Sequence, residues 1–292
     1  MDEQRREGHE VSFTTWASVR MLRSADEVWI HCGWLPCLWW AALWGRNVHW
    51  MPEACYDSVR LGFHGWKKWL AGPFERFFLR RAKSIVATCE AEKGWIESYL
   101  GRRCPPIEVT DIKRFFDLSR VERVDRVESG ELHLLYLGRR HPLKGVEYLE
   151  KAVAELNSNP VNPVNPVQNS SLHVSTRSTR LKIVSSAFGE ELEKVWDWCD
   201  VLVLPTLSEN FGLVVAEALE RGKRVITTDG APAWGENLSR AERVETCREG
   251  EVLSGYGGRL IYLKGYRDGS DGKRVGLLKS AIELFCRAEH KG

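Results

Sequence analysis

Short and almost continuous apolar runs alternate with helix-like segments in the second half of this chain. The strongest runs are residues 132–137, 201–205 and 224–228, and helical patterns cover residues 145–157 and 213–221. Strands that are apolar on both faces and separated by helices are typical of a parallel sheet with helices packed on both sides. The sequence therefore predicts an α/β fold for this half.

The first half shows the same alternation. Residues 27–32 and 84–88 have the pattern of short strands, and residues 35–44 that of an apolar helix. An amphipathic helix is expected over residues 66–83, with an interruption at Gly72-Pro73, and a further helix should end at Leu100. This half therefore also predicts an α/β unit.

A polar and charged segment, residues 101–130, separates the two halves and has the character of a connection between domains. A chain of 292 residues is long enough for two cores. We expect an N-terminal domain over residues 1–118 and a C-terminal domain over residues 119–292.

Charge and cysteine usage exclude several classes of function. Lys and Arg number 42 against 40 Asp and Glu, so the net charge of +2 lacks the basic excess of a general nucleic-acid binder. The eight cysteines show no metal-ligand spacing, which disfavours a zinc site and a disulfide framework. Residues 28–45 carry no charge, but His31, Gly33 and Pro36 disfavour a membrane span. The charged N-terminus is unlike a signal peptide, so we expect a cytoplasmic protein.

The loop and helix start after the strand at residues 201–205 carry the most informative side chains. Ligands of open α/β sheets bind beyond the carboxyl ends of strands, where helix N-termini present free N–H groups that suit a phosphate. Eight residues correspond to about 80° around a helix, so the two glutamates of this stretch should contact different parts of one ligand. The candidate ligand-binding residues are Glu209, Asn210, Phe211, Gly212, Leu213 and Glu217.

A second candidate site follows the strand at residues 132–137. Gly138 ends this strand, and Arg139 and Lys144 lie on either side of the turn before the next helix. A guanidinium that orients and an ammonium that neutralises would together suit a diphosphate. An ordinary basic loop is the alternative interpretation of this short motif.

Together these residues resemble the retaining glycosyltransferases of family four, which have the two-domain GT-B fold. That family carries Gly-Arg…Lys-Gly after the first strand of its C-terminal domain, then Glu-x7-Glu and a closing Thr-x-Gly turn. This chain has all three in order, the last as Thr228-Asp-Gly, and the resemblance covers residues 131–238.

The N-terminal half is similar to the same family in three places: a possible strand at Gly8-His9-Glu10-Val11, the strand end at Ile30-His31, and residues 82–92. Two features depart from the family pattern. Only seven residues precede Gly8, where the family usually has one more strand and a glycine-rich loop, so we expect a shortened N-terminal domain. The family's Pro-His-Gly turn is Pro52-Glu53-Ala54 in this chain.

The resemblance implies two Rossmann-like domains whose parallel sheets face a central cleft, with the last helix (about residues 272–290) packing back on the N-terminal domain. It also implies transfer of a sugar from a nucleotide-diphosphate sugar, with retained anomeric configuration and without a metal or other cofactor. Arg139, Lys144 and the N–H groups of residues 211–214 would stabilise the leaving diphosphate. By the family pattern, Glu217 would hold the nucleotide ribose and Glu209 the donor sugar.

The acceptor that the resemblance implies is a cell-envelope glycan or a lipid-linked glycan of the lipopolysaccharide, capsule or exopolysaccharide type. A degenerate family member that acts as a binding or partner subunit is the alternative. Glu53 has two interpretations: a carboxylate that faces the donor sugar and acts in catalysis, or a solvated acid that favours the start of the next helix. A dinucleotide oxidoreductase is excluded because no G-x-G-x-x-G follows a strand.

Residues 60–83 carry seven Lys and Arg against one acid, Glu75, and these charges are interleaved with Trp and Phe. A basic and aromatic amphipathic segment can lie in the interface of an anionic membrane. The alternative is a helix that packs its aromatic residues into the N-terminal core. The membrane interpretation predicts a peripheral location on the inner face of the cell membrane.

Overall fold

The computed structural model describes residues 10–63, 65–110, 131–158, 178–239, 245–246, 252–255 and 258–287. The chain forms two compact units. The first comprises residues 1–87 and 92–110, and the second comprises residues 88–91 and 111–292. The expected boundary between residues 118 and 119 lies outside the described residues, so it stays a prediction.

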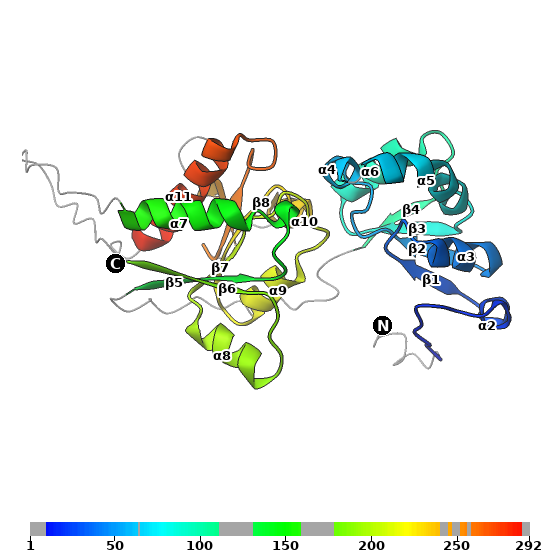
Figure 1. Cartoon of the computed structure of the whole chain (residues 1–292), viewed down its shortest axis with the longest axis horizontal. Coiled ribbons are helices and arrows are strands. Elements are labelled where there is room, and N and C mark those ends of the chain that lie inside the picture. Colours follow the sequence, from blue (N-terminus) through cyan, green and yellow to red (C-terminus); the bar gives the residue numbers. More distant parts are fainter. Residues whose placement is uncertain are drawn as a thin grey trace, which may run out of the picture. The chain divides into compact units, whose positions relative to one another are not determined.

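The first unit is built on a four-stranded parallel sheet with the order β1-β2-β3-β4 (Figure 1). Its core contains the fully buried side chains of Trp50, Leu79, Ile85 and Ile96. Figure 1 shows α4, α5 and α6 together on one side of this sheet. The strands are β1 (Val28–His31), β2 (Val48–Met51), β3 (Ser84–Ala87) and β4 (Ile107–Val109). The helices are α2 (Val19–Ser24), α3 (Pro36–Trp44), α4 (Ser58–Gly62), α5 (Gly65–Leu79) and α6 (Glu90–Leu100).

Three expectations for this unit are wrong. Helix α5 runs unbroken through Pro73, although proline removes one backbone donor, because residues on both sides of it pack on neighbouring elements. Of the strand expected at residues 8–11, residues 10–11 form none, and Gly8 and His9 lie outside the described residues. The polar segment after residue 100 contains a strand, β4, which pairs with β3.

The only acid of α5, Glu75, lies inside the first unit and is fully buried. Its carboxylate accepts hydrogen bonds from the Trp34 backbone N–H (3.0 Å), the Tyr56 hydroxyl (2.5 Å) and the Trp39 indole N–H. A buried carboxylate requires such donors, since its desolvation is costly. These contacts attach α5 to α3 and to the loops that follow β1 and β2.

The second unit has a seven-stranded sheet with the order β6-β5-β7-β8-β11-β10-β9. The first five strands in this order are parallel, as expected, and β10 and β9 add an antiparallel edge that the sequence did not indicate. The strands are β5 (Leu132–Leu137), β6 (Thr179–Val184), β7 (Val201–Leu204), β8 (Arg224–Thr228), β9 (Glu245–Thr246), β10 (Val252–Gly255) and β11 (Leu260–Leu263).

Helices cover both faces of this sheet, with α7 and α11 on one side and α8 and α9 on the other (Figure 1). The helices are η3 (Pro142–Lys144), α7 (Val146–Ser158), α8 (Glu190–Trp198), α9 (Leu213–Glu220), α10 (Pro232–Ser239) and α11 (Asp271–Arg287). The last helix, α11, contacts α7 and β11, and its residues Leu278, Ala281 and Ile282 belong to the core of the second unit. Its apolar face is therefore used within its own unit, and packing of this helix on the N-terminal domain stays a prediction.

Candidate functional site

Three loops of the second unit meet at one edge of its sheet. Strand β7 lies between β5 and β8, and all three are parallel, so their carboxyl ends are at the same edge. The loops that leave them are residues 138–145, 205–212 and 229–231. Both motifs that the sequence singled out, and the closing Thr-x-Gly turn, are therefore neighbours in space.

Backbone hydrogen bonds join these loops to one another. The Leu143 carbonyl accepts from the Thr206 hydroxyl at 3.0 Å and from the Leu207 N–H at 2.8 Å. The Glu209 N–H donates to the Gly230 carbonyl at 2.7 Å. The loop after β7 is thus held on one side by the loop after β5 and on the other by the loop after β8.

Two glycines allow the loops to approach this closely. A Cβ atom on Gly145 would lie 2.1 Å from the Pro205 carbonyl oxygen, and one on Gly230 would lie 2.1 Å from the Thr206 carbonyl oxygen. Gly145 also has a φ of +61°, which side chains other than glycine rarely adopt. Glycine is therefore required at both positions for the edge to close.

Lys144 and Glu209, 65 residues apart in sequence, form an ion pair at this edge. The lysine lies at the end of η3, and the glutamate lies in the loop after β7. The second carboxylate oxygen of Glu209 accepts from the Asn210 N–H at 3.1 Å. The two side chains are only 20% and 16% exposed, so solvent screens their attraction less than on an open surface. The sequence assigned them to one ligand, and the structure brings them into contact.

Arg139 lies beside this pair in sequence but has a different environment. It follows Gly138 at the end of β5, and its carbonyl accepts from the Tyr136 hydroxyl at 2.9 Å. Burial raises the pKa of Tyr136 to about 12, so the hydroxyl stays a donor. The Arg139 side chain is exposed and has no ion-pair partner among the described residues, whereas Arg140 is paired with Glu150 at 2.5 Å. Arg139 is therefore available to an anion.

Helix α9 begins at this edge with Gly212 as its N-cap, in the left-handed conformation, and no side chain caps its first turn. The buried Phe211 fixes the approach to the helix, because its carbonyl accepts from the Trp234 indole N–H at 2.7 Å. Leu213, at the first turn, is exposed. A helix start that no side chain caps has N–H groups that suit an anionic ligand.

Glu217, in the middle of α9, is half-buried, and its carboxylate has no hydrogen-bond partner among the described residues. Its backbone carbonyl accepts from Arg221, but that contact leaves both carboxylate oxygens unused. A half-buried carboxylate is costly without a hydrogen-bond partner, and a ligand hydroxyl could supply one.

The sequence analysis missed a role for Asp229, which follows β8. Its two carboxylate oxygens accept from the Gly265 N–H at 2.6 Å and the Arg267 N–H at 2.7 Å, and burial raises its pKa. These bonds hold the turn after β8 to the loop after β11. Its place inside the Thr-x-Gly turn was the signal that could have found it.

Glu53, in the first unit, lies in the turn after β2 with a φ of +56°. Its Oε1 atom is 3.1 Å from Nδ1 of His31, at the end of β1. The carboxylate of Glu92 accepts from the Ala54 N–H at 2.5 Å and so fixes this turn. The next helix, α4, has Asp57 as its N-cap, so the interpretation of Glu53 as an acid at a helix start is wrong.

Cys32 and Cys55 lie next to this turn, with their sulfur atoms 3.7 Å apart. A hydrogen bond from the Cys55 thiol lowers the pKa of Cys32 to about 6, and burial together with the same contact raises the pKa of Cys55. The spacing of Cys32 and Cys55 in the chain does not predict their contact, because the contact depends on the parallel pairing of β1 with β2.

The chain has two α/β units, each built on a sheet with parallel strands. The sheet of the second unit has a glycine-lined edge that presents cations and an uncapped helix start. These features define the class of two-domain Rossmann-like proteins. The family described as "Glycosyl transferases group 1" matches residues 131–244, and "Glycosyl transferase 4-like domain" matches residues 1–111. The chain belongs to this family, the family 4 glycosyltransferases.

Two curated relatives are both named D-inositol 3-phosphate glycosyltransferase. The protein from Arthrobacter sp. is 34% identical over 115 residues, which are 35% of this chain and 27% of the relative. The protein from Pseudarthrobacter chlorophenolicus is 28% identical over 166 residues, which are 50% of this chain and 40% of the relative. The matches thus span between about a quarter and two fifths of the curated relatives.

Solved structures show the fold. A sucrose-phosphate synthase from Thermosynechococcus elongatus has a TM-score of 0.56 at 14% identity, covering 92% of this chain and 69% of that chain. A UDP-forming trehalose-phosphate synthase from Burkholderia xenovorans has a TM-score of 0.56 at 10% identity, covering 92% and 68%. The expected GT-B fold is confirmed.

Proposed function

We propose that this protein transfers a glycosyl group from a nucleotide-sugar donor to an acceptor hydroxyl, with retention of the anomeric configuration. The observation that carries this proposal is the contact between Lys144 and Glu209 beside the uncapped start of α9. A nucleotide sugar needs cations and N–H donors at its diphosphate and carboxylate acceptors at its hydroxyl groups. This edge offers both kinds of group side by side.

In the reaction, the bond between the anomeric carbon and the diphosphate oxygen breaks, and its electron pair leaves with the diphosphate. The acceptor oxygen forms the new bond on the same face of the sugar, and its proton passes to the diphosphate oxygen that leaves. Arg139, Lys144 and the N–H groups at the start of α9 stabilise the negative charge that grows on the leaving group. Glu209 accepts hydrogen bonds from the donor sugar, and Glu217 accepts them from the ribose.

Glu53 is proposed to act on the sugar or on the acceptor. Its carboxylate would stabilise positive charge on the transferring sugar or accept a hydrogen bond from a hydroxyl group. Its position after β2, at the carboxyl end of a parallel strand and in contact with His31, supports this role. Loops at that end of a strand are where open α/β sheets bind ligands.

The acceptor is proposed to be a cell-envelope glycan or glycolipid of the lipopolysaccharide, capsule or exopolysaccharide type. The names of the two curated relatives add inositol phosphate to the acceptors that should be tested. A phosphorylated polyol and a lipid-linked glycan differ in size and in solubility, so a panel that contains both separates these classes.

A membrane surface is proposed as a partner of residues 60–83. The described part of the chain contains no helix long and apolar enough to cross a membrane. In α5, however, Trp66, Trp69, Phe74 and Phe77 are exposed, with Trp69 at 81%, while Glu75 is buried. Four aromatic side chains of α5 are thus at the surface, and Phe78 packs against the core. Exposed aromatic and basic side chains on one helix favour an anionic lipid interface.

Transfer is tested by incubating the purified protein with several nucleotide sugars and measuring nucleotide release with and without acceptors. Arg139→Ala and Lys144→Ala should each raise the barrier by about 2 to 4 kcal/mol, as when a pre-organised electrostatic contact is lost. Arg140→Ala is the matched control, because Arg140 is paired with Glu150. Wild-type turnover in either test variant would contradict the assignment of the diphosphate site. Nucleotide binding without turnover for any donor would instead favour the partner-subunit alternative.

Membrane association is tested by flotation with liposomes. We expect binding that needs anionic lipid and weakens with salt, since each basic residue near such a surface contributes about 1 kcal/mol. Binding that ignores the lipid charge would contradict this part of the proposal.

A further inference from the structure

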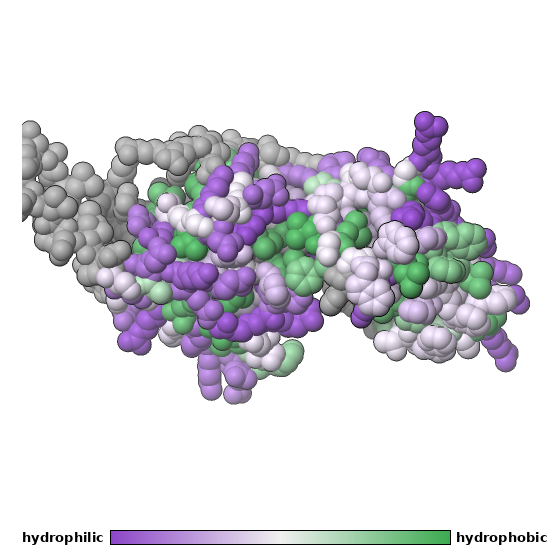
Figure 2. Space-filling view, turned by 45° about the horizontal axis from the view of Figure 1, so that its top comes forward, coloured by the Kyte–Doolittle hydropathy of each residue, from purple (hydrophilic) through white to green (hydrophobic). Residues whose placement is uncertain are grey.

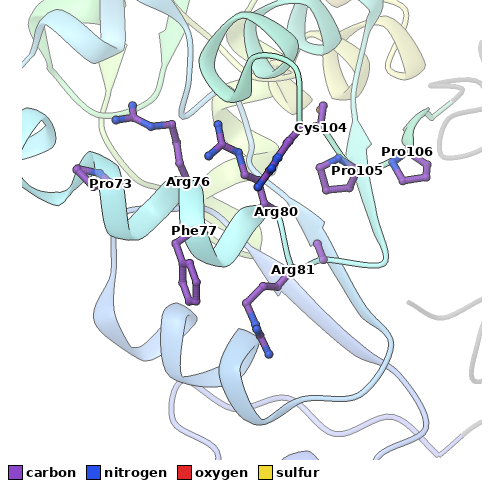
Figure 3. Close-up of a pocket in the computed structure, with 10 residues that line it drawn as sticks. Pro73, Arg76, Phe77, Arg80, Arg81, Cys104, Pro105 and Pro106 are labelled. Atoms are coloured by element: carbon purple, nitrogen blue, oxygen red, sulfur yellow. The ribbon is translucent and has the colours of Figure 1, made fainter.

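A hollow of about 720 Å³ lies at the C-terminal end of α5 in the first unit (Figure 3). Figure 3 shows Arg76 and Phe77 leaving α5, Arg80 and Arg81 in the turn beyond it, and Pro105 and Pro106 on the segment that leads into β4. Arg103 also lines this hollow. We call this hollow the arginine pocket.

The lining of the arginine pocket contains four arginines and no acid. Aromatic and backbone contacts hold three of the guanidinium groups: Arg76 lies 5.2 Å from the centre of the Tyr99 ring, Arg81 lies 5.7 Å from that of Phe77, and Arg80 donates to the Leu100 carbonyl. Among the described residues, none of the four forms a salt bridge with a carboxylate. Their positive charge is therefore left for an external anion.

The chemistry of this lining favours a phosphate over other anions. A guanidinium is planar and presents N–H groups in a fork that matches two oxygens of a phosphate. Stacking on the rings of Tyr99 and Phe77 limits the rotation of two of these forks, so less conformational entropy is lost when an oxyanion binds.

The arginine pocket is separate from the proposed catalytic groups of the first unit. Ala82, which lines it, precedes β3, and Pro106 precedes β4, so it lies at the amino ends of these parallel strands. His31 is the last residue of β1 and Glu53 follows β2, so both are at the carboxyl ends of these strands. The two groups of residues are thus at opposite edges of one sheet, and an anion in the pocket is not the sugar acceptor held by Glu53.

The exposed aromatic face of α5 continues from this pocket. Phe77 lines it, and Phe74 and Trp69 follow toward the start of the helix, all three exposed. Figure 2 shows pale and green side chains next to purple ones in the part of the surface that α4, α5 and α6 form. A water-soluble anion would use the arginines but leave these rings in water. A lipid would occupy both, because its phosphate lies directly above the interfacial layer that aromatic rings enter.

We propose that the arginine pocket binds the phosphate group of an anionic phospholipid while the aromatic face of α5 enters the membrane interface. This inference rests on the membrane surface proposed above for residues 60–83, and it is independent of the transfer reaction. The pocket would make the binding specific for a phosphate group, whereas basic residues alone are attracted to any anionic surface. The occupant is a lipid headgroup, not a free phosphate.

The test compares vesicles of phosphatidylcholine alone, with added phosphatidylglycerol, and with oleate at the same negative surface charge. Arg81→Gln combined with Arg103→Gln removes two pocket charges. Arg46→Gln combined with Arg102→Gln is the matched control, since both are exposed arginines of the first unit that neither line the pocket nor belong to residues 60–83. We expect phosphatidylglycerol to bind better than oleate, and the pocket variant to lose about tenfold in that affinity. The control variant should stay within about twofold of the wild type.

Three results would overturn the proposal. Equal binding to oleate and phosphatidylglycerol vesicles, or equal losses in the two double variants, would indicate general electrostatic attraction without a phosphate site. Binding of inorganic phosphate in the pocket with no gain from phosphatidylglycerol would assign the pocket to a soluble anion. Tryptophan fluorescence of both variants verifies folding, and vesicle binding requires no sugar donor, so failure of the proposed transfer activity would leave this test readable.

Discussion

Replacing Glu75 with alanine tests the most unusual feature of the first unit. In the folded protein the carboxylate accepts from the Trp34 N–H, the Trp39 indole N–H and the Tyr56 hydroxyl. Alanine would leave all three donors without this acceptor. An unpaired buried donor costs about 1 to 3 kcal/mol. We use the lower value, about 1 kcal/mol, for each of the three donors, because two of them are only partly buried. The expected loss in the free energy of unfolding is about 3 kcal/mol.

Urea denaturation followed by tryptophan fluorescence measures this loss in the correct part of the molecule. Ten of the 13 tryptophans precede residue 100, so the signal comes mainly from the first unit even if the two units unfold separately. Glu97→Ala is the control, because Glu97 is an exposed acid on α6. Exposed substitutions of this kind change stability by about 0.5 kcal/mol or less.

Glu75→Gln refines the test. Glutamine keeps one acceptor oxygen but turns an NH₂ group toward the remaining donors, so we expect a loss between those of the wild type and the alanine variant. If the urea midpoint of Glu75→Ala differed from that of the wild type no more than the midpoint of Glu97→Ala does, the reasoning would be refuted. In that case, water or rearranged side chains would satisfy the three donors, and the carboxylate would not be what holds α5.

Three further predictions concern the loops. Glu53→Gln should lower kcat by about tenfold, roughly 1.4 kcal/mol, with little change in KM, and kcat within about twofold of the wild type would exclude a transition-state role. The alkylation rate of Cys32 by iodoacetamide should rise through a midpoint near the pKa of about 6, and Cys55→Ala should move that midpoint upward because the thiol donor is lost; an unmoved midpoint would contradict this cause. Gly145→Ala should cost about 2 to 4 kcal/mol in thermal or urea unfolding, because its Cβ would collide with a backbone oxygen, while Gly276→Ala, which meets no atom within 4 Å, should not destabilise the protein.

Sequence reasoning succeeded where local pattern determines structure. The apolar runs at β5, β7 and β8 required burial on both faces, and this indicated a parallel sheet before any contact was known. Because the carboxyl ends of such strands share an edge, the loops that carry Arg139 and Glu209 could be assigned to one region. The three-residue strand β4 was missed because its formation depends on pairing with β3, which a polar segment does not reveal.

The remaining failures involve contacts between distant residues. The sequence left open whether the aromatic residues of α5 lie in the core or at the surface, and it gave no position for Glu75. Glu75 is inside because donors from other segments meet it, while most of the aromatic residues of α5 are exposed. Lys144 and Glu209 are 65 residues apart, and sequence reasoning assigned both to one ligand but did not predict their ion pair. Helix α5 also continued through Pro73, since tertiary packing overrode the local tendency to break.

The Leu143 carbonyl accepts hydrogen bonds from both the Thr206 hydroxyl and the Leu207 N–H, and this affects how substitutions at this edge of the sheet would act. One of its two bonds is purely backbone, and Glu209 is tied to Gly230 in the same way. The positions of the lysine and the glutamate are therefore encoded largely in main-chain geometry. Side chains around them can be exchanged without moving them, so long as the close-approach glycines stay. We therefore expect this edge to tolerate exchange of the surrounding side chains, so that redesign of these side chains would show which of them select the proposed donor.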